Sequence, residues 1–302
     1  MRLFVDPHGS WLDARRCRRR IWAGLLSIPL LVVLFTPAAH AETHFVSYDA
    51  IDYAFRGPAR IPPGLTTIQI VNKGKEPHHI QLLKLDPGKT VGDFRAAVKG
   101  HPSRFPAWAR YVGGPNTVVP GDRAATSQLL SPGLYLLVCV IPDKTGKPHF
   151  ARGMIASLTV SAGDGPTVPT ISPDVIVTLS DFRFALSAPI TAGTRTLQVI
   201  NQGTQVHEVV VVRLPPDGSI QRFAEAFAPG AALPEAPPGT PIGGVTGIEP
   251  GWQEWLTMTF EPGRYGLVCF SLDPETGVPH FTKGMLSQFD VAAPSNSGTP
   301  KP

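Results

Sequence analysis

Two sets of four side chains with metal-binding chemistry recur along the 302 residues of the chain, in the same order each time. Each set holds two imidazoles, a thiol and a thioether, in the order His78, Cys139, His149 and Met154, then His207, Cys269, His280 and Met285. Two histidines and a cysteine, with a weak axial methionine, are the ligands of a blue copper centre, and these donors suit both copper oxidation states. The sequence therefore predicts two type 1 copper ions as cofactors.

The elements that must position these residues belong to a duplicated sequence. The offset between the copies rises from 129 residues at His78 and His207 to 131 at Met154 and Met285. The clearest matches are 67–74 with 196–203, 132–139 with 262–269, and 148–154 with 279–285. Segments rich in Val, Ile, Thr and Leu alternate with Gly and Pro turns, which is typical of a β-sandwich.

We therefore expect an all-β chain of two tandem Greek-key β-sandwich domains, over residues 42–162 and 170–293, joined by a linker at 163–169. Each copy contains one short helical insertion. Thr90 precedes the first helix, and Asp93 stands at the position of a capping box. Ser219 precedes the second, whose apolar residues recur at helical spacing from Ile220 to Phe227. Both apolar stripes are expected to pack on the core. The Pro- and Gly-rich residues 228–247 predict an open connection.

This arrangement resembles the cupredoxin family, which includes plastocyanin, azurin and the type 1 domain of copper nitrite reductases. In that family a Gly-containing turn leads to the first histidine, a Tyr-containing strand ends in cysteine, and a loop returns through histidine to methionine. The resemblance covers both copies, and it implies that the eight residues above are copper ligands and that the function is electron transfer. Nine residues separate Cys139 from His149 and ten separate Cys269 from His280. These lengths resemble the longer loop of the nitrite reductases.

Two alternatives to copper stay open at this point. A disulfide between Cys139 and Cys269 is one, but equivalent points of two separately folded domains usually lie beyond the ~7 Å limit between Cα atoms. Zinc is the other, although structural zinc sites are built from Cys, His and carboxylate ligands rather than Met.

Other histidines have weaker patterns. His79 aligns with Glu208 in the second copy, so it is not expected to be a ligand, and strand alternation would point it to the opposite face from His78. His101 has no counterpart and is expected on the surface.

His44 is a candidate for a separate N-terminal Cu(II) site. If cleavage follows Ala41, the new amine, two backbone nitrogens and the His44 imidazole form a square-planar set of nitrogens, which Cu(II) prefers. The alternative is that His44 merely opens the first strand.

Residues 1–41 have the pattern of a cleaved signal peptide. Arginines at 15, 16, 18, 19 and 20 precede an apolar run from Ile21 to Phe35, and small residues follow at Ala39 and Ala41. The run is shorter than the ~20 residues of a spanning helix, and Pro29 interrupts it. We expect a periplasmic or secreted protein with no stable membrane insertion, and a disordered tail at 294–302.

Charge also bears on partners. The first 41 residues hold six of the 27 basic and two of the 23 acidic residues, which leaves 21 of each. No Lys- or Arg-rich stretch remains, so no nucleic-acid partner is expected. The expected partner is a redox protein or a copper donor or acceptor.

The sequence predicts that the chain is not an enzyme. No His-x-His pair follows residue 41, and no histidine flanks either ligand cysteine. Seven histidines follow that residue, and four are assigned already, which leaves too few for a trinuclear copper cluster. An electron carrier with two centres is the first hypothesis. The alternatives are a copper storage or delivery protein, and an interaction module in which copper serves stability alone.

Overall fold

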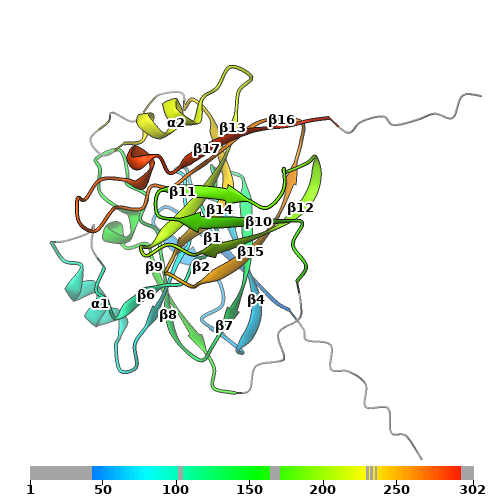
Figure 1. Cartoon of the computed structure of the whole chain (residues 1–302). Coiled ribbons are helices and arrows are strands. Elements are labelled where there is room, and N and C mark those ends of the chain that lie inside the picture. Colours follow the sequence, from blue (N-terminus) through cyan, green and yellow to red (C-terminus); the bar gives the residue numbers. More distant parts are fainter. Residues whose placement is uncertain are drawn as a thin grey trace, which may run out of the picture. The chain divides into compact units, whose positions relative to one another are not determined.

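The repeated segments form strands in three β-sheets (Figure 1). The computed structural model describes residues 43–100, 105–163, 171–228, 231, 234 and 237–293. The predicted signal peptide, the tail at 294–302 and all of the predicted linker except Gly163 lie outside the described residues.

The first copy contains nine strands, one α-helix and one 3-10 helix: β1 (His44–Ile51), β2 (Ala54–Arg56), β3 (Arg60–Ile61), β4 (Gly64–Asn72), β5 (Gln81–Leu85), α1 (Val91–Ala97), β6 (Ala109–Tyr111), β7 (Arg123–Leu130), β8 (Gly133–Val138), η1 (His149–Arg152) and β9 (Ile155–Val160). The second copy repeats this order without a counterpart of β3: β10 (Val175–Ser180), β11 (Arg183–Leu186), β12 (Gly193–Asn201), β13 (His207–Leu214), α2 (Ile220–Ala226), β14 (Thr240–Ile248), β15 (Gln253–Phe260), β16 (Gly263–Val268), η2 (His280–Lys283) and β17 (Leu286–Val291).

Each copy is a two-layer sandwich. In the first, Tyr48 and Ile70 of the eight-stranded sheet pack with Leu82 and Leu137 of the five-stranded sheet. A second cluster joins residues of β10, β12 and β15 to residues of the four-stranded sheet β14-β13-β16-β17. Buried and less buried residues alternate along β1 and β10, as expected for strands with one face on the core. The predicted all-β sandwich architecture is confirmed.

Both predicted helices are present and cover the outer faces of the smaller sheets. The capping box of Thr90 and Asp93 forms as predicted, with the Asp93 amide donating to Thr90 Oγ1 over 3.1 Å. Ser219 caps α2. Phe94 of α1 and Phe223 of α2 are buried against the smaller sheets. Both helices are drawn as short coils in Figure 1.

The expectation of an open connection over residues 228–247 is wrong from Thr240 onward, because these residues form β14, which pairs with β13. Gly243 and Gly244 lie within this strand, and a Cβ at Gly244 would lie 2.0 Å from the Val209 carbonyl oxygen. The glycine therefore allows a close approach of two strands within the sheet rather than marking a turn.

The two copies share backbone pairing. Two residue pairs join β7 to β15, so that one eight-stranded sheet runs through both copies. The segment 112–118 also pairs with β14, with Pro115 opposite Val245, Val112 opposite Ile248 and Val118 opposite Ile242. With an offset of 130 residues, each outer pair is the repeat equivalent of the other, so the interface has pseudo-twofold symmetry like an isologous dimer.

Candidate metal centres

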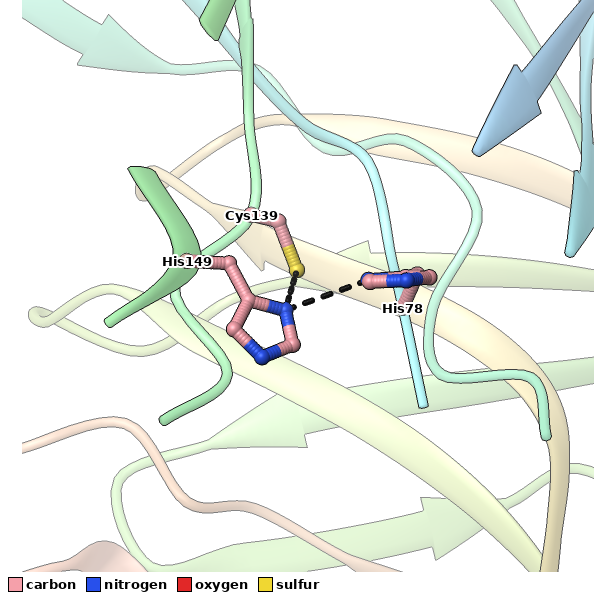
Figure 2. A group of neighbouring side chains, drawn as sticks. All are labelled: His78, Cys139 and His149. Atoms are coloured by element: carbon pink, nitrogen blue, oxygen red, sulfur yellow. Dashed lines mark hydrogen bonds between the residues drawn. The ribbon is translucent and has the colours of Figure 1, made fainter. Parts of the chain in front are cut away.

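The predicted imidazole and thiol donors converge in each copy. His78 Nδ1 lies 3.1 Å from His149 Nδ1, which in turn lies 3.5 Å from Cys139 Sγ. Figure 2 shows the His149 ring nitrogen between the cysteine sulfur and the other imidazole. In the second copy the matching distances are 3.0 Å between the two Nδ1 atoms and 3.6 Å from Cys269 Sγ to His280 Nδ1. All six side chains are fully buried.

The end of one strand and the loop to the next position three members of each set. Cys139 directly follows β8, His149 opens η1 and Met154 directly precedes β9. The Met154 amide donates to the His149 carbonyl oxygen over 3.0 Å, and the Cys139 amide donates to the Met154 carbonyl oxygen over 3.4 Å. Gly153 ends η1 with a φ of 117°, a left-handed conformation that favours glycine. Met154 is fully buried, and Met285 occupies the same position beside Cys269 and His280.

A buried aspartate organises each loop between cysteine and histidine. Asp143 accepts hydrogen bonds from the Thr145 hydroxyl and from the Thr145 and Lys147 amides, and it pairs with Arg152 of η1. These contacts hold the pKa of Asp143 well below its usual range. In the second copy Asp273 pairs with Lys283. The longer loops are therefore anchored to the short helix that carries the second histidine.

Sequence reasoning missed an aspartate beside the first histidine of each set. His78 Nε2 lies 2.7 Å from Asp52 Oδ1, and His207 Nε2 lies 2.8 Å from Asp181 Oδ1. Burial alone would raise the pKa of Asp181, but hydrogen bonds from Thr204 and His207 lower it to about 2. The signal that could have found this pair is its recurrence at the same offset of 129 residues as the two histidines.

Glycine in the turn before each histidine makes room for this contact. A Cβ at Gly74 would lie 2.3 Å from Asp52 Oδ1 and 2.7 Å from His78 Nε2. The turn itself is held by Asn72, whose Oδ1 accepts from the Gly74 amide and whose Nδ2 donates to the Val118 carbonyl oxygen. Asn201 and Gly203 repeat these features in the second copy.

The donor sets fit a soft or borderline cation. An Nε2–H that donates to Asp181 leaves the lone pair of His207 on Nδ1, and an Nε2–H that donates to Gln205 does the same for His280. The two Nδ1 atoms then present lone pairs to one another at 3.0 Å. Burial raises the pKa of the Cys269 thiol to about 12 when no cation is near, but a coordinated metal deprotonates a thiol outright. Nitrogen, nitrogen and sulfur donors of this kind match copper.

The two centres differ beside their second histidine. Glu76 Oε2 lies 2.9 Å from His149 Nε2, without the alignment of a hydrogen bond, and accepts from the Tyr53 hydroxyl over 3.1 Å. Gln205 takes the equivalent place beside His280, at 2.9 Å. The first centre therefore has an acidic neighbour where the second has a neutral amide.

The remaining histidines stand apart from the donor groups. His79 is buried, and its Nε2 accepts from the Val140 amide over 3.0 Å. His44 opens β1, opposite Thr66. The residue that would supply the amine of its candidate N-terminal site, Glu42, lies outside the described residues, as does His101. Cys139 and Cys269 are both free thiols, so the disulfide alternative is not formed.

The metal-free protein is expected to lose stability as pH falls below about 6.5. Burial lowers the pKa of His79 to about 3 and that of His280 to about 4. The unfolded chain takes up protons near pH 6.5 while the folded chain does not, so acid favours unfolding down to the folded pKa. For a shift as large as that of His79, the loss at pH about 4 is about 3 kcal/mol. Denaturant unfolding at several pH values measures it, with His79→Gln expected to give a shallower dependence. A flat profile would contradict this account.

Solved structures of copper proteins are similar to this chain, although no family model and no curated protein matches it. Reduced auracyanin from Roseiflexus castenholzii is 21% identical, with 40% of this chain and 97% of that chain covered and a TM-score of 0.28. The blue copper oxidase from Nitrosomonas europaea is 17% identical, with 83% and 86% covered and a TM-score of 0.25. Copper nitrite reductase from Nitrosomonas europaea is 12% identical, with 83% and 94% covered and a TM-score of 0.25.

Each sandwich carries its converging donors where a strand end meets the returning loop. Both sandwiches have a cupredoxin-like fold.

The prediction that the chain is not an enzyme is wrong as an exclusion. It depended on the missing His-x-His pair and on the apolar neighbours of each ligand cysteine. The solved structures that cover 83% of this chain include an oxidase and a nitrite reductase, which are enzymes.

The helices of the structure bear on membrane insertion. Within the part of the chain that the structure describes, no helix has the length and apolar character needed to span a bilayer.

Proposed function

We propose that the chain binds one copper ion in each cupredoxin-like domain and that both centres transfer electrons. The supporting observation is the buried convergence of His, Cys and His donors at equivalent places in both copies. Copper bound to such donors supplies a one-electron couple between Cu(II) and Cu(I). Zinc also binds Cys and His donors, but it has no redox chemistry.

The surrounding residues keep each centre rigid. Asp52 and Asp181 orient the first imidazole of each set, and such outer partners fix the ring and raise the basicity of the ligand. The second imidazole and the methionine belong to a loop fastened by the backbone hydrogen bonds around Cys139 and Cys269. A site held in this way needs little rearrangement when its charge changes.

Met154 and Met285 would be weak thioether ligands of the two coppers, and their substitution separates electron transfer from storage. Met154→Leu should keep copper and colour but raise the reduction potential of the first centre, because a donor that stabilises Cu(II) is lost. Met285→Leu should do the same to the second. His149→Ala and His280→Ala should weaken copper retention instead. Spectroelectrochemistry and metal analysis of the four variants measure both effects.

Two results would overturn parts of this proposal. If the methionine variants lose copper as badly as the histidine variants, the sites are storage-like and methionine is a primary ligand. If the bound copper cannot be reduced and reoxidised, the function is copper delivery or structural support.

Partner and location are proposed from the sequence. We propose that residues 1–41 direct export to the periplasm or medium, and that the protein exchanges electrons there with a redox partner. The first 41 residues carry the basic and apolar segments of a signal peptide.

A further inference from the structure

A path of neighbouring polar side chains leads from the backbone beside Cys139 into the interface between the domains. The Val140 amide, one residue after the cysteine, donates to His79 Nε2 over 3.0 Å. Because Nε2 accepts, the neutral imidazole carries its proton on Nδ1. The Asn116 side chain lies next to the ring, where it partly offsets the lowering of the His79 pKa by burial.

The same path continues into the second domain. Asn116 Nδ2 donates to Glu208 Oε2 over 3.0 Å. Glu208 Oε1 accepts from the Phe270 amide over 3.0 Å, and Phe270 directly follows Cys269. The Glu208 amide also donates to Cys269 Sγ over 3.4 Å. His79, Asn116 and Glu208 thus connect the peptide after one candidate ligand cysteine to the peptide after the other.

The pseudo-twofold symmetry of the interface explains why these side chains of the two domains meet. His79 and Glu208 are repeat equivalents, and each binds the amide that follows its own cysteine. They approach each other because 112–118 pairs with β14 across the interface. Asn116 is fully buried, and its own amide donates to the Gly244 carbonyl oxygen.

Interface stability alone does not require this connection. Thr246, the repeat equivalent of Asn116, also makes buried contacts across the interface, to the carbonyl oxygens of Ile80 and Gly114. These contacts do not reach a residue adjacent to either cysteine. Asn116 therefore contacts Glu208, which binds the amide after Cys269, whereas Thr246 contacts only backbone carbonyl groups of the interface.

We propose that His79, Asn116 and Glu208 form the path by which an electron passes between the two centres, an inference that rests on the proposed function. One centre is oxidised from Cu(I) to Cu(II) while the other is reduced from Cu(II) to Cu(I), and no bond is formed or broken. A thiolate shares its charge most strongly with copper, so a path that starts beside each cysteine couples the centres. An electron tunnels more readily through bonds and short hydrogen bonds than across a gap.

The test follows electron redistribution within the copper-loaded full chain. Cys139→Ser and Cys269→Ser first assign the absorption and electron paramagnetic resonance signal of each centre. A pulse that delivers less than one electron per chain then reduces the protein, and the concentration-independent phase that follows reports exchange between the centres. The variant is Asn116→Leu, which removes the middle of the path, and the matched control is Thr246→Val.

The expected result is that Asn116→Leu slows this phase several-fold while copper content and both potentials stay unchanged. Thr246→Val should keep the parental rate although it also loses interface hydrogen bonds. An unchanged rate in Asn116→Leu, or equal slowing in both variants, would overturn the path.

Two further arms keep the inference falsifiable. If Asn116→Leu does not fold, Glu208→Gln is used: its amide group offers one oxygen where the carboxyl offers two, so either the Asn116 link or the Phe270 link is lost. If the parent shows both centres but no concentration-independent phase, the path is wrong and the proposed function stands. If the parent lacks one centre, the proposed function itself fails.

Discussion

Cys139→Ser is expected to remove one of the two bound coppers and about half of the visible absorption, with Cys269→Ser doing the same at the second centre. Thiolate is the soft ligand that selects copper, and a serine hydroxyl in the same buried place is a hard, weakly acidic group. The double variant should be colourless. Because the two sets of donors lie in different domains, we expect the losses to add.

Metal analysis and the visible spectrum after Cu(II) addition measure the result. The unfolding free energy of each metal-free variant is the control, since a serine in place of a buried cysteine must leave the fold intact. A single variant that keeps both coppers, or that loses both, would contradict independent centres.

Glu76→Gln is expected to raise the reduction potential of the first centre. The Glu76 carboxylate lies 2.9 Å from His149 Nε2, and a negative charge there favours Cu(II) over Cu(I). A charge at such a partly exposed position changes the free energy of reduction by about 1–2 kcal/mol, which is about 40–90 mV for a one-electron couple. Gln205→Glu should lower the potential of the second centre by a similar amount, because it creates the same arrangement beside His280.

Exchanging both residues should therefore reverse much of the difference between the centres. Spectroelectrochemical titration of the single and double variants measures the two potentials. Glu261→Gln is the matched control: it also removes a carboxylate, but from an exposed ion pair with Arg213 at the end of β16 far from Cys269. A shift in the control as large as in Glu76→Gln would show that total charge, rather than the neighbour of His149, sets the potential.

The His, Cys and His groups that lie together in the structure can be picked out from the sequence because the repeat presents every signal twice. Cys139 and His149 stand at the two ends of one loop, so local spacing brings them together. His78 lies 71 residues before His149, and its place beside them is an expectation from the family resemblance. The capping of α1 by Thr90 is likewise a local pattern that the structure confirms.

Contacts between distant segments are what the sequence does not reveal. Asp52 lies 26 residues before His78, and only the parallel pairing of β1 with β4 carries the end of β1 to the histidine turn. The shared eight-stranded sheet forms by pairing of β7 with β15. The backbone groups at the edge of a strand are the same whatever its sequence, so the sequence does not indicate which edges will pair. Asn116 has no metal-ligand chemistry, so its place between the domains has no signal in composition or spacing.

Copper counting together with the visible spectrum of the parent protein tests the central claim most directly. Purified protein is titrated with Cu(II), freed of weakly bound metal, and analysed for copper per chain and for free thiols. We predict two tightly bound coppers per chain with intense thiolate-to-Cu(II) absorption, lost reversibly on reduction. A colourless protein, or one that holds fewer than two coppers with both thiols intact, would contradict it.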